Sequence, residues 1–180
     1  MKIMKRIYMI PLVLVCLGLW AGSSWSLSLE VDATQVAEIR ASEESEDIRF
    51  LASFELPDTL EGKSIDFACV SFEADCAGAE GGVSFQSFAV TRAWDAKNVS
   101  WDGPWDKAGG DWDDRLSACW ISETGSDRMV ELDVTEFANR WVEEPSANFG
   151  IIVKVSGPFI GTFSLKKGQA PKLRILYSDM

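Results

Sequence analysis

Tryptophans and carboxylates alternate along one short segment, residues 94–112, which reads W-D-A-K-N-V-S-W-D-G-P-W-D-K-A-G-G-D-W and holds four of the eight tryptophans. Its glycines and proline break any helix or continuous strand, so it is predicted to be a structured loop. Indole faces stack on sugar rings, and carboxylates accept hydrogen bonds from sugar hydroxyls. We therefore predict that Trp105 and Trp112, with Asp106 beside them, bind carbohydrate. The alternative is that the rings brace the loop from within, as we expect for Trp94, Trp101 and Trp141.

A second group of carboxylates closes this segment. Asp111, Asp113 and Asp114 directly follow a pair of glycines. Calcium prefers oxygen ligands, so Asp111 and Asp113 are candidate ligands of a calcium ion, the one cofactor that the sequence suggests. Their spacing differs from that of an EF-hand loop. The simpler alternative is that Asp111 accepts hydrogen bonds from the backbone amides of a turn while its neighbours are solvated.

The chain contains no histidine. Its absence removes the commonest general base and every nucleophile that relies on a histidine partner, and it argues against a zinc site. A pair of carboxylates could hydrolyse a glycosidic bond, but nothing in the spacing selects two of the 28 acidic residues. We therefore predict a binding protein that is not an enzyme, and we keep a carboxylate-based glycoside-cleaving enzyme as an alternative.

The first residues have the pattern of an export signal. Positive side chains are followed by an apolar run over residues 7–20 and by small residues up to Ser26, so residues 1–26 are predicted to be a signal peptide. The apolar run is shorter than the roughly 20 residues that span a bilayer. Retention as an anchor and lipidation at Cys16 are the alternatives. The expected location is secreted or extracytoplasmic, with no transmembrane segment in the mature chain.

The chain is strongly acidic, with a formal net charge of −11. Cleavage after residue 26 would remove three positive charges, those of Lys2, Lys5 and Arg6, and no negative ones, which changes −11 to −14. Such a charge argues against nucleic acid and against anionic membranes as partners. One basic cluster remains, which could contact an anionic glycan or form a solvated sheet face: Lys154, Lys166, Lys167, Lys172 and Arg174.

Three cysteines would remain after export, Cys69, Cys76 and Cys119. In an oxidising compartment they predict one disulfide and one leftover thiol, with the pairing left open. The separation of Cys69 and Cys76 fits neither a zinc knuckle nor a redox C-x-x-C motif.

Strand-like alternation dominates the rest of the chain. From Ile48 to Leu56 apolar side chains occupy alternate positions, and Pro57 ends the run. The alternation changes phase around Gln86 and Ser87, which predicts a β-bulge there. Further strands are predicted over residues 68–72, 83–90, 130–134, 151–155, 159–165 and 173–177.

One helix is predicted to interrupt the strands. Asp133 and Glu136 resemble a capping box, the apolar residues after them recur at helical spacing, and Pro145 ends the pattern. Many short strands with a single helix indicate an all-β fold, an antiparallel β-sandwich of jelly-roll type with one short helix at its end. Residues 27–47 would supply an N-terminal strand and an acidic turn, and residues 48–180 the jelly roll.

Seven short motifs stand in a fixed order along the chain. They are R-F-L-A-S-F-E-L-P from Arg49, I-D-F-A-C-V-S-F from Ile65, A-W-D-A-K-N-V-S-W from Ala93, A-G-G-D-W-D from Ala108, L-D-V-T-E-F-A-N-R-W-V from Leu132, N-F-G-I-I-V-K from Asn148 and P-K-L-R-I-L-Y from Pro171. In this order they resemble the DNRLRE-domain family, which is related to alginate-type carbohydrate-binding modules, over roughly residues 48–177. The string that gives the family its name does not occur. The resemblance implies a jelly-roll fold, extracellular display and, more loosely, carbohydrate affinity.

These features together predict an exported, non-catalytic binding module whose partner is a polysaccharide or another cell-surface component. The alternative is a structural or adhesive surface protein, in which the sandwich packs against other chains. A fold does not decide between them, because function depends on the site that the fold carries.

Overall fold

The computed structural model describes residues 26–43, 45, 47–77, 83–122, 127–156, 162–166 and 168–179. Most of this part of the chain is extended. Its helical elements are η1 (Asp58–Leu60), α1 (Thr135–Glu143) and η2 (Pro145–Ala147). Its strands are β1 (Leu27–Asp32), β2 (Gln35–Arg40), β3 (Ile48–Ser53), β4 (Lys63–Ala77), β5 (Val83–Val90), β6 (Trp112–Ser122), β7 (Asp127–Asp133), β8 (Ile151–Ser156), β9 (Thr162–Leu165) and β10 (Lys172–Asp179).

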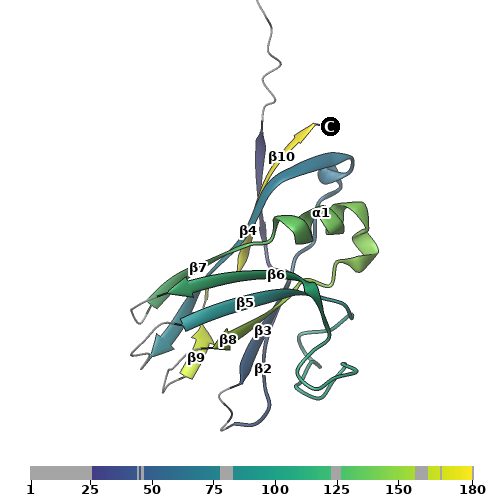
Figure 1. Cartoon of the computed structure of the whole chain (residues 1–180). Helices are drawn as coiled ribbons and strands as arrows, with labels where there is room; N and C mark the ends of the chain where they lie inside the picture. Colours follow the sequence, from purple (N-terminus) through teal and green to yellow (C-terminus); the bar gives the residue numbers. More distant parts are fainter. Residues whose placement is uncertain are drawn as a thin grey trace, which may run out of the picture.

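The strands form two antiparallel sheets of five strands each (Figure 1). The first sheet has the order β1-β10-β4-β7, with β9 paired to the end of β4, and the second has the order β2-β3-β8-β5-β6. Most connections cross from one sheet to the other, and without β2 and β9 the two orders are those of a jelly roll. The predicted antiparallel β-sandwich is confirmed. The sequence pattern did not predict β6. It also predicted a single strand in residues 27–47, where the structure has two, β1 in the first sheet and β2 in the second.

Alternate side chains of the two sheets meet in the main core between them. Phe72 packs edge to face against two other rings there. Its centroid lies 4.6 Å from that of Phe50 and 5.9 Å from that of Phe85. Such contacts add to the stabilisation that burial of the rings provides. Each ring comes from a different strand, β3, β4 or β5, so this cluster joins both sheets.

The helix α1 closes one end of this core (Figure 1). It begins after Asp133, whose Oδ1 accepts hydrogen bonds from the backbone N of Thr135 at 3.0 Å and from its hydroxyl at 2.6 Å. It ends at Glu143, two residues before Pro145. Its apolar stripe enters the main core, as the helical spacing predicts: Phe137, Ala138 and Trp141.

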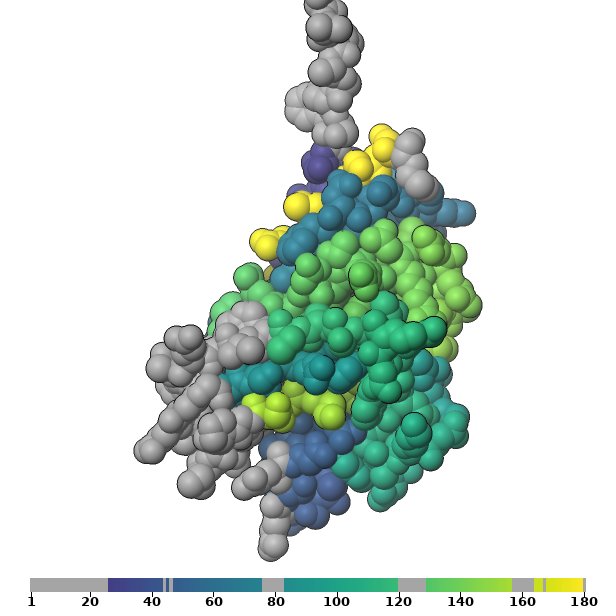
Figure 2. Space-filling model, in the orientation of Figure 1, coloured from purple at the N-terminus to yellow at the C-terminus, as the bar shows by residue number. Residues whose placement is uncertain are grey.

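The outer face of the second sheet is buried as well. Ile39, Leu51, Phe88 and Ile152 point away from the main core, one from each of four neighbouring strands. They pack beneath residues 91–111, which we call the tryptophan loop. In Figure 2 this loop forms the teal lobe at the lower right, beside the blue of β2 and β3. The molecule therefore has a third layer, made of loop, over one face of a two-layer sandwich.

This third layer explains the change of phase in β5, so the predicted β-bulge at Gln86 and Ser87 is wrong. β5 pairs with β8 in an unbroken register from Ser84 to Ala89, and its register with β6 shifts only between Phe88 and Ala89. Ala89 faces the main core, whereas Phe88 faces the tryptophan loop. The apolar pattern changes phase because the end of β5 is buried on both faces.

The expected disulfide is not formed, since Cys69 and Cys119 are both free thiols. The side chain of Cys76 lies outside the described residues. Cys69 and Cys76 belong to the same strand, β4, seven residues apart, and a strand rises about 3.3 Å per residue. A separation of roughly 23 Å exceeds the roughly 7 Å that a disulfide can bridge between Cα atoms.

No helix in the described part of the chain is both long enough and apolar enough to span a bilayer.

Candidate functional site

The tryptophan loop is held together by its own rings. Trp105 is 8% exposed, and its indole Nε1 donates a hydrogen bond to the carbonyl of Ser100 at 2.9 Å. Trp94 is 9% exposed and donates from Nε1 to the carbonyl of Phe149 at 2.8 Å. A sugar-stacking platform needs an exposed ring face. The geometry of Trp105 therefore favours the bracing role over the predicted binding role.

Trp112 is half-buried, and cations of the protein itself lie over its ring. The guanidinium carbon of Arg49 is 5.2 Å from the ring centroid and the Nζ of Lys154 is 5.4 Å from it. Phe88 packs against the same residue at 5.5 Å between centroids. These distances are those of cation–π and aromatic contacts that stabilise a fold. Trp112, the second tryptophan predicted to stack on a sugar, therefore makes its ring contacts within the chain.

Arg49 connects the second sheet to the tryptophan loop. It is 7% exposed, and its guanidinium carbon lies 4.3 Å from the centroid of Trp101. Its Nη1 donates to the carbonyl of Gly109 at 2.7 Å, and its Nε and Nη2 donate to the carboxylate of Asp47 at 3.1 Å and 2.9 Å. Gly109 has φ +90°, and a Cβ there would lie 2.3 Å from the same Nη1. Only glycine lets the loop approach Arg49 this closely.

Asp111 caps a turn of the loop, which is the simpler alternative to the predicted calcium site. Its carboxylate accepts hydrogen bonds from the backbone N of Asp106 at 2.8 Å and of Lys107 at 3.1 Å. Arg92 Nε lies 3.0 Å from the same carboxylate, and Arg92 also pairs with the side chain of Asp106. The predicted sugar-contacting carboxylate of Asp106 therefore already has a cationic partner, although its side chain is 75% exposed.

Asp113, the other predicted calcium ligand, is bound by two arginines instead. Its side chain is 9% exposed, and its carboxylate accepts hydrogen bonds from the Arg115 guanidinium at 2.9 Å and from Arg140 Nη1 at 2.9 Å. The Arg115 side chain and backbone N, followed by Arg140, hold the pKa of Asp113 well below its usual range. Within the described residues, no group of three or more acidic or cysteine side chains is arranged to hold a metal ion.

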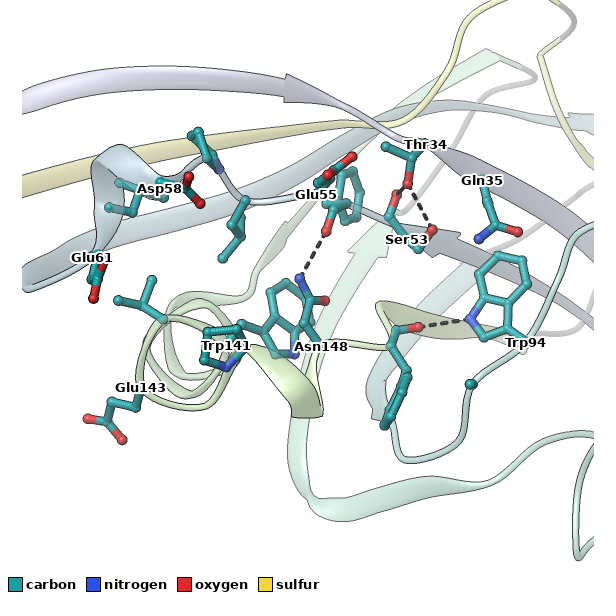
Figure 3. A pocket seen from close by; sticks show the side chains of 18 residues that line it. Thr34, Gln35, Ser53, Glu55, Asp58, Glu61, Trp94, Trp141, Glu143 and Asn148 are labelled. Carbon is teal, nitrogen blue, oxygen red and sulfur yellow. Dashed lines mark hydrogen bonds between the residues drawn. The ribbon is translucent and has the colours of Figure 1, made fainter.

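A cleft with a volume of about 740 Å³ opens at the end of the sandwich that α1 closes (Figure 3). Four parts of the chain form its walls: the β1–β2 turn, the connection from β3 to β4, the start of the tryptophan loop, and α1 with the residues up to 149. This volume is within the range of about 300–1,000 Å³ that is usual for small-molecule sites. We take this cleft as the candidate functional site.

Polar contacts between distant segments fix the walls of the cleft. Asn148 Nδ2 donates to the carbonyl of Phe54 at 2.9 Å, and its Oδ1 accepts from the backbone N of Gly150 at 3.2 Å. Gly150 has φ +81°, and a Cβ there would lie 2.1 Å from the carbonyl oxygen of Ala52, so only glycine fits against β3. Opposite this wall, Gln35 accepts a hydrogen bond from the backbone N of Ala96 at 3.0 Å.

Acidic side chains line the cleft on two sides. Glu55, Asp58 and Glu61 belong to the connection between β3 and β4, and Glu143 belongs to the end of α1. All four are exposed, and Figure 3 shows Asp58, Glu61 and Glu143 at one end of the cleft and Trp94 with Gln35 at the other. The cleft therefore combines an apolar interior, polar amide and hydroxyl groups, and exposed carboxylates.

None of the residues predicted from the sequence to bind a ligand or a metal lines this cleft. The predicted residues gather in the tryptophan loop and at the start of β6, whereas the cleft is lined by residues from four distant segments. Two tryptophans of the motif pattern, Trp94 and Trp141, do reach it, but they were expected as core residues. The one sequence signal for the cleft was the cluster of acidic residues between Leu51 and Lys63. This cluster lies in a connection between strands, and such connections often carry functional residues.

Searches with protein-family models and against curated proteins find no match to this chain. The resemblance to DNRLRE domains accordingly remains a prediction, and the function must be argued from the site.

Proposed function

We propose that this chain is an exported, non-catalytic module that binds carbohydrate in the cleft at the α1 end of the sandwich. The observation that carries the proposal is the composition of the cleft, a volume of about 740 Å³ bounded by the half-buried ring of Phe149 and by aliphatic, amide, hydroxyl and carboxylate groups. Sugar binding uses apolar faces for the ring carbons and polar groups for the hydroxyls. The cleft offers both, on walls held by hydrogen bonds between strands and loops.

Two features support binding without catalysis. The chain has no histidine to serve as a base or to activate a nucleophile. The carboxylates that border the cleft are exposed, whereas a glycosidase acid is usually held in an apolar environment that raises its pKa. The signal-like pattern of residues 1–26 supports export, which would bring the protein to extracellular or cell-surface glycans.

A glycan array with the purified protein tests the proposal. Ala93 lies exposed in the wall of the cleft, so the variant Ala93→Trp places a large ring in it without removing a core contact. We expect bound glycans to lose at least about tenfold in affinity with this variant. The matched control is Ser117→Trp, an exposed position on β6 away from the cleft, which should bind as the unmodified protein does.

The other two functions give different results in the same preparation. A structural surface protein would form concentration-dependent oligomers in light scattering and bind no glycan on the array. A carboxylate-based glycosidase would release reducing ends from a polysaccharide panel. Unchanged binding in Ala93→Trp would show that the glycan is bound elsewhere.

A further inference from the structure

All the charged side chains that line the cleft among the described residues are acidic. Its acidic lining residues are Glu55, Asp58, Glu61 and Glu143, and no lysine or arginine is among the described residues that line it. None of the four forms an ion pair with another described residue. In the tryptophan loop region, by contrast, Arg92 pairs with Asp106 and Asp111, and Arg115 and Arg140 pair with Asp113. The cleft is thus a place where the chain leaves negative charge for a partner to balance.

The apolar interior adds a second requirement on that partner. Half-buried or exposed apolar side chains line it: Leu56, Val142, Pro145 and Phe149. A metal ion or a small inorganic cation would leave these surfaces exposed to water. An organic cation whose carbon skeleton contacts the apolar walls while its ammonium groups face the carboxylates satisfies both.

We propose that the ligand of this cleft is a glycan that carries protonated amino groups, that is, a polymer or oligomer of amino sugars without N-acetyl groups. This inference rests on the proposed function and narrows it to one class of carbohydrate. Ring faces of such sugars contact the apolar walls, and their ammonium groups lie near the two acidic sides. An anionic glycan is repelled by the same groups, because like charges at short range oppose association.

The experiment compares two oligosaccharides of equal length by isothermal titration calorimetry with the full chain. The first is a β-1,4-linked tetramer of glucosamine, and the second is the same tetramer with every amine N-acetylated. The titrations are run at about pH 5.5, so that the free amines of the first tetramer are protonated. We expect the free-amine tetramer to bind at least about tenfold more tightly. The preference should fall to under about threefold when the salt concentration rises from about 20 mM to about 500 mM.

Charge-neutralising variants assign the effect to the cleft. The triple variant Glu55→Gln, Glu61→Gln and Glu143→Gln removes three carboxylates that line it and should abolish the preference for free amines. The matched control removes three exposed carboxylates that do not line it: Glu43→Gln, Asp102→Asn and Glu131→Gln. Because the net charge changes equally in both, the control should keep the preference.

Each contrary outcome has a distinct meaning. Equal or tighter binding of the N-acetylated tetramer overturns the amino-sugar inference and leaves carbohydrate binding standing. Equal loss in the two triple variants overturns it too, because net charge rather than the cleft would then be responsible. Binding of tetralysine as tight as that of the free-amine tetramer replaces the sugar by a basic peptide. Failure of both tetramers and of every array glycan ends the proposed function itself.

Discussion

The tryptophan loop and the cleft lie side by side, joined by the hydrogen bond from Trp94 Nε1 to the carbonyl of Phe149, yet they differ in open volume and in how their charges are balanced. In the loop, Trp105 is buried and Trp112 is covered by cationic side chains of the same chain. In the cleft, Trp94 and Trp141 are buried as well, at 9% and 1% exposed. The open space there is bordered by the half-buried ring of Phe149, by aliphatic side chains and by four exposed carboxylates that form no ion pair with a described residue. The aromatic side chains of the loop region are bound by other groups of the same chain, whereas the cleft has open volume that a ligand can fill.

The difference teaches that a high local density of tryptophan does not by itself mark a binding surface. The outer face of the second sheet carries Leu51, Phe88 and Ile152, and these side chains must be shielded from water. A loop rich in large rings covers them with few residues, and Arg92 pairs with the carboxylates of Asp106 and Asp111 within it. Open volume and unbalanced charge are therefore better guides to the site of this protein than aromatic content.

The largest test of the comparison is Trp105→Ala. Because the ring is 8% exposed and packs under the loop, its loss should lower the free energy of unfolding by about 3 kcal/mol, at the lower end of values for buried aromatic residues. The measurement is urea denaturation followed by tryptophan fluorescence. Glycan affinity of the folded protein should not change. An unchanged stability together with lost glycan binding would instead make Trp105 the sugar platform.

Arg49→Met is expected to have a smaller effect of about 2 kcal/mol. It keeps the apolar stem but removes the stacking on Trp101 and the hydrogen bonds to Gly109 and Asp47. The control is Arg174→Met, at an exposed position on β10, where the change should stay within about 0.5 kcal/mol. Equal effects of the two substitutions would show that Arg49 does not hold the loop to the sheet.

Asp113→Asn should have the smallest effect, about 1 kcal/mol at neutral pH, through weakened hydrogen bonds to Arg115 and Arg140. Since the folded pKa of Asp113 is lowered, its carboxylate contributes fully above the unfolded pKa of about 3.9. That contribution is lost as the pH falls towards the folded pKa. Urea denaturation from about pH 7 to about pH 3 should show the gap between variant and parent closing below about pH 4. A gap that is constant with pH would contradict the role of the charge.

Much of the sandwich follows from local patterns. Alternation in Ile48–Leu56 and in residues 151–155 places one row of side chains in the main core, as expected for half-buried strands. The helix spacing after Asp133 gives α1 its buried stripe. The strand β6 escaped prediction because only Leu116 and Ala118 keep a clear alternation beside a run of charged residues.

The third layer left a trace in the sequence that alternation alone does not interpret. Phe50-Leu51-Ala52 and Ile151-Ile152-Val153 are unbroken apolar runs, and such runs indicate strands that are buried on both faces. They predict that something covers the outer face of the second sheet. They do not say that the cover is the tryptophan loop, because that contact joins residues about 60 positions apart, such as Arg49 and Gly109.

The sequence by itself determined the class of the fold, since the period of two along the strands and the single helical stripe are local properties of the chain. Only the tertiary structure decided which aromatic rings are buried and where a cavity remains. Both depend on segments that are distant in sequence and meet only after the two sheets have closed, as at the contact of Asn148 with Phe54. Exposure is a property of such an assembly, and no single segment carries it.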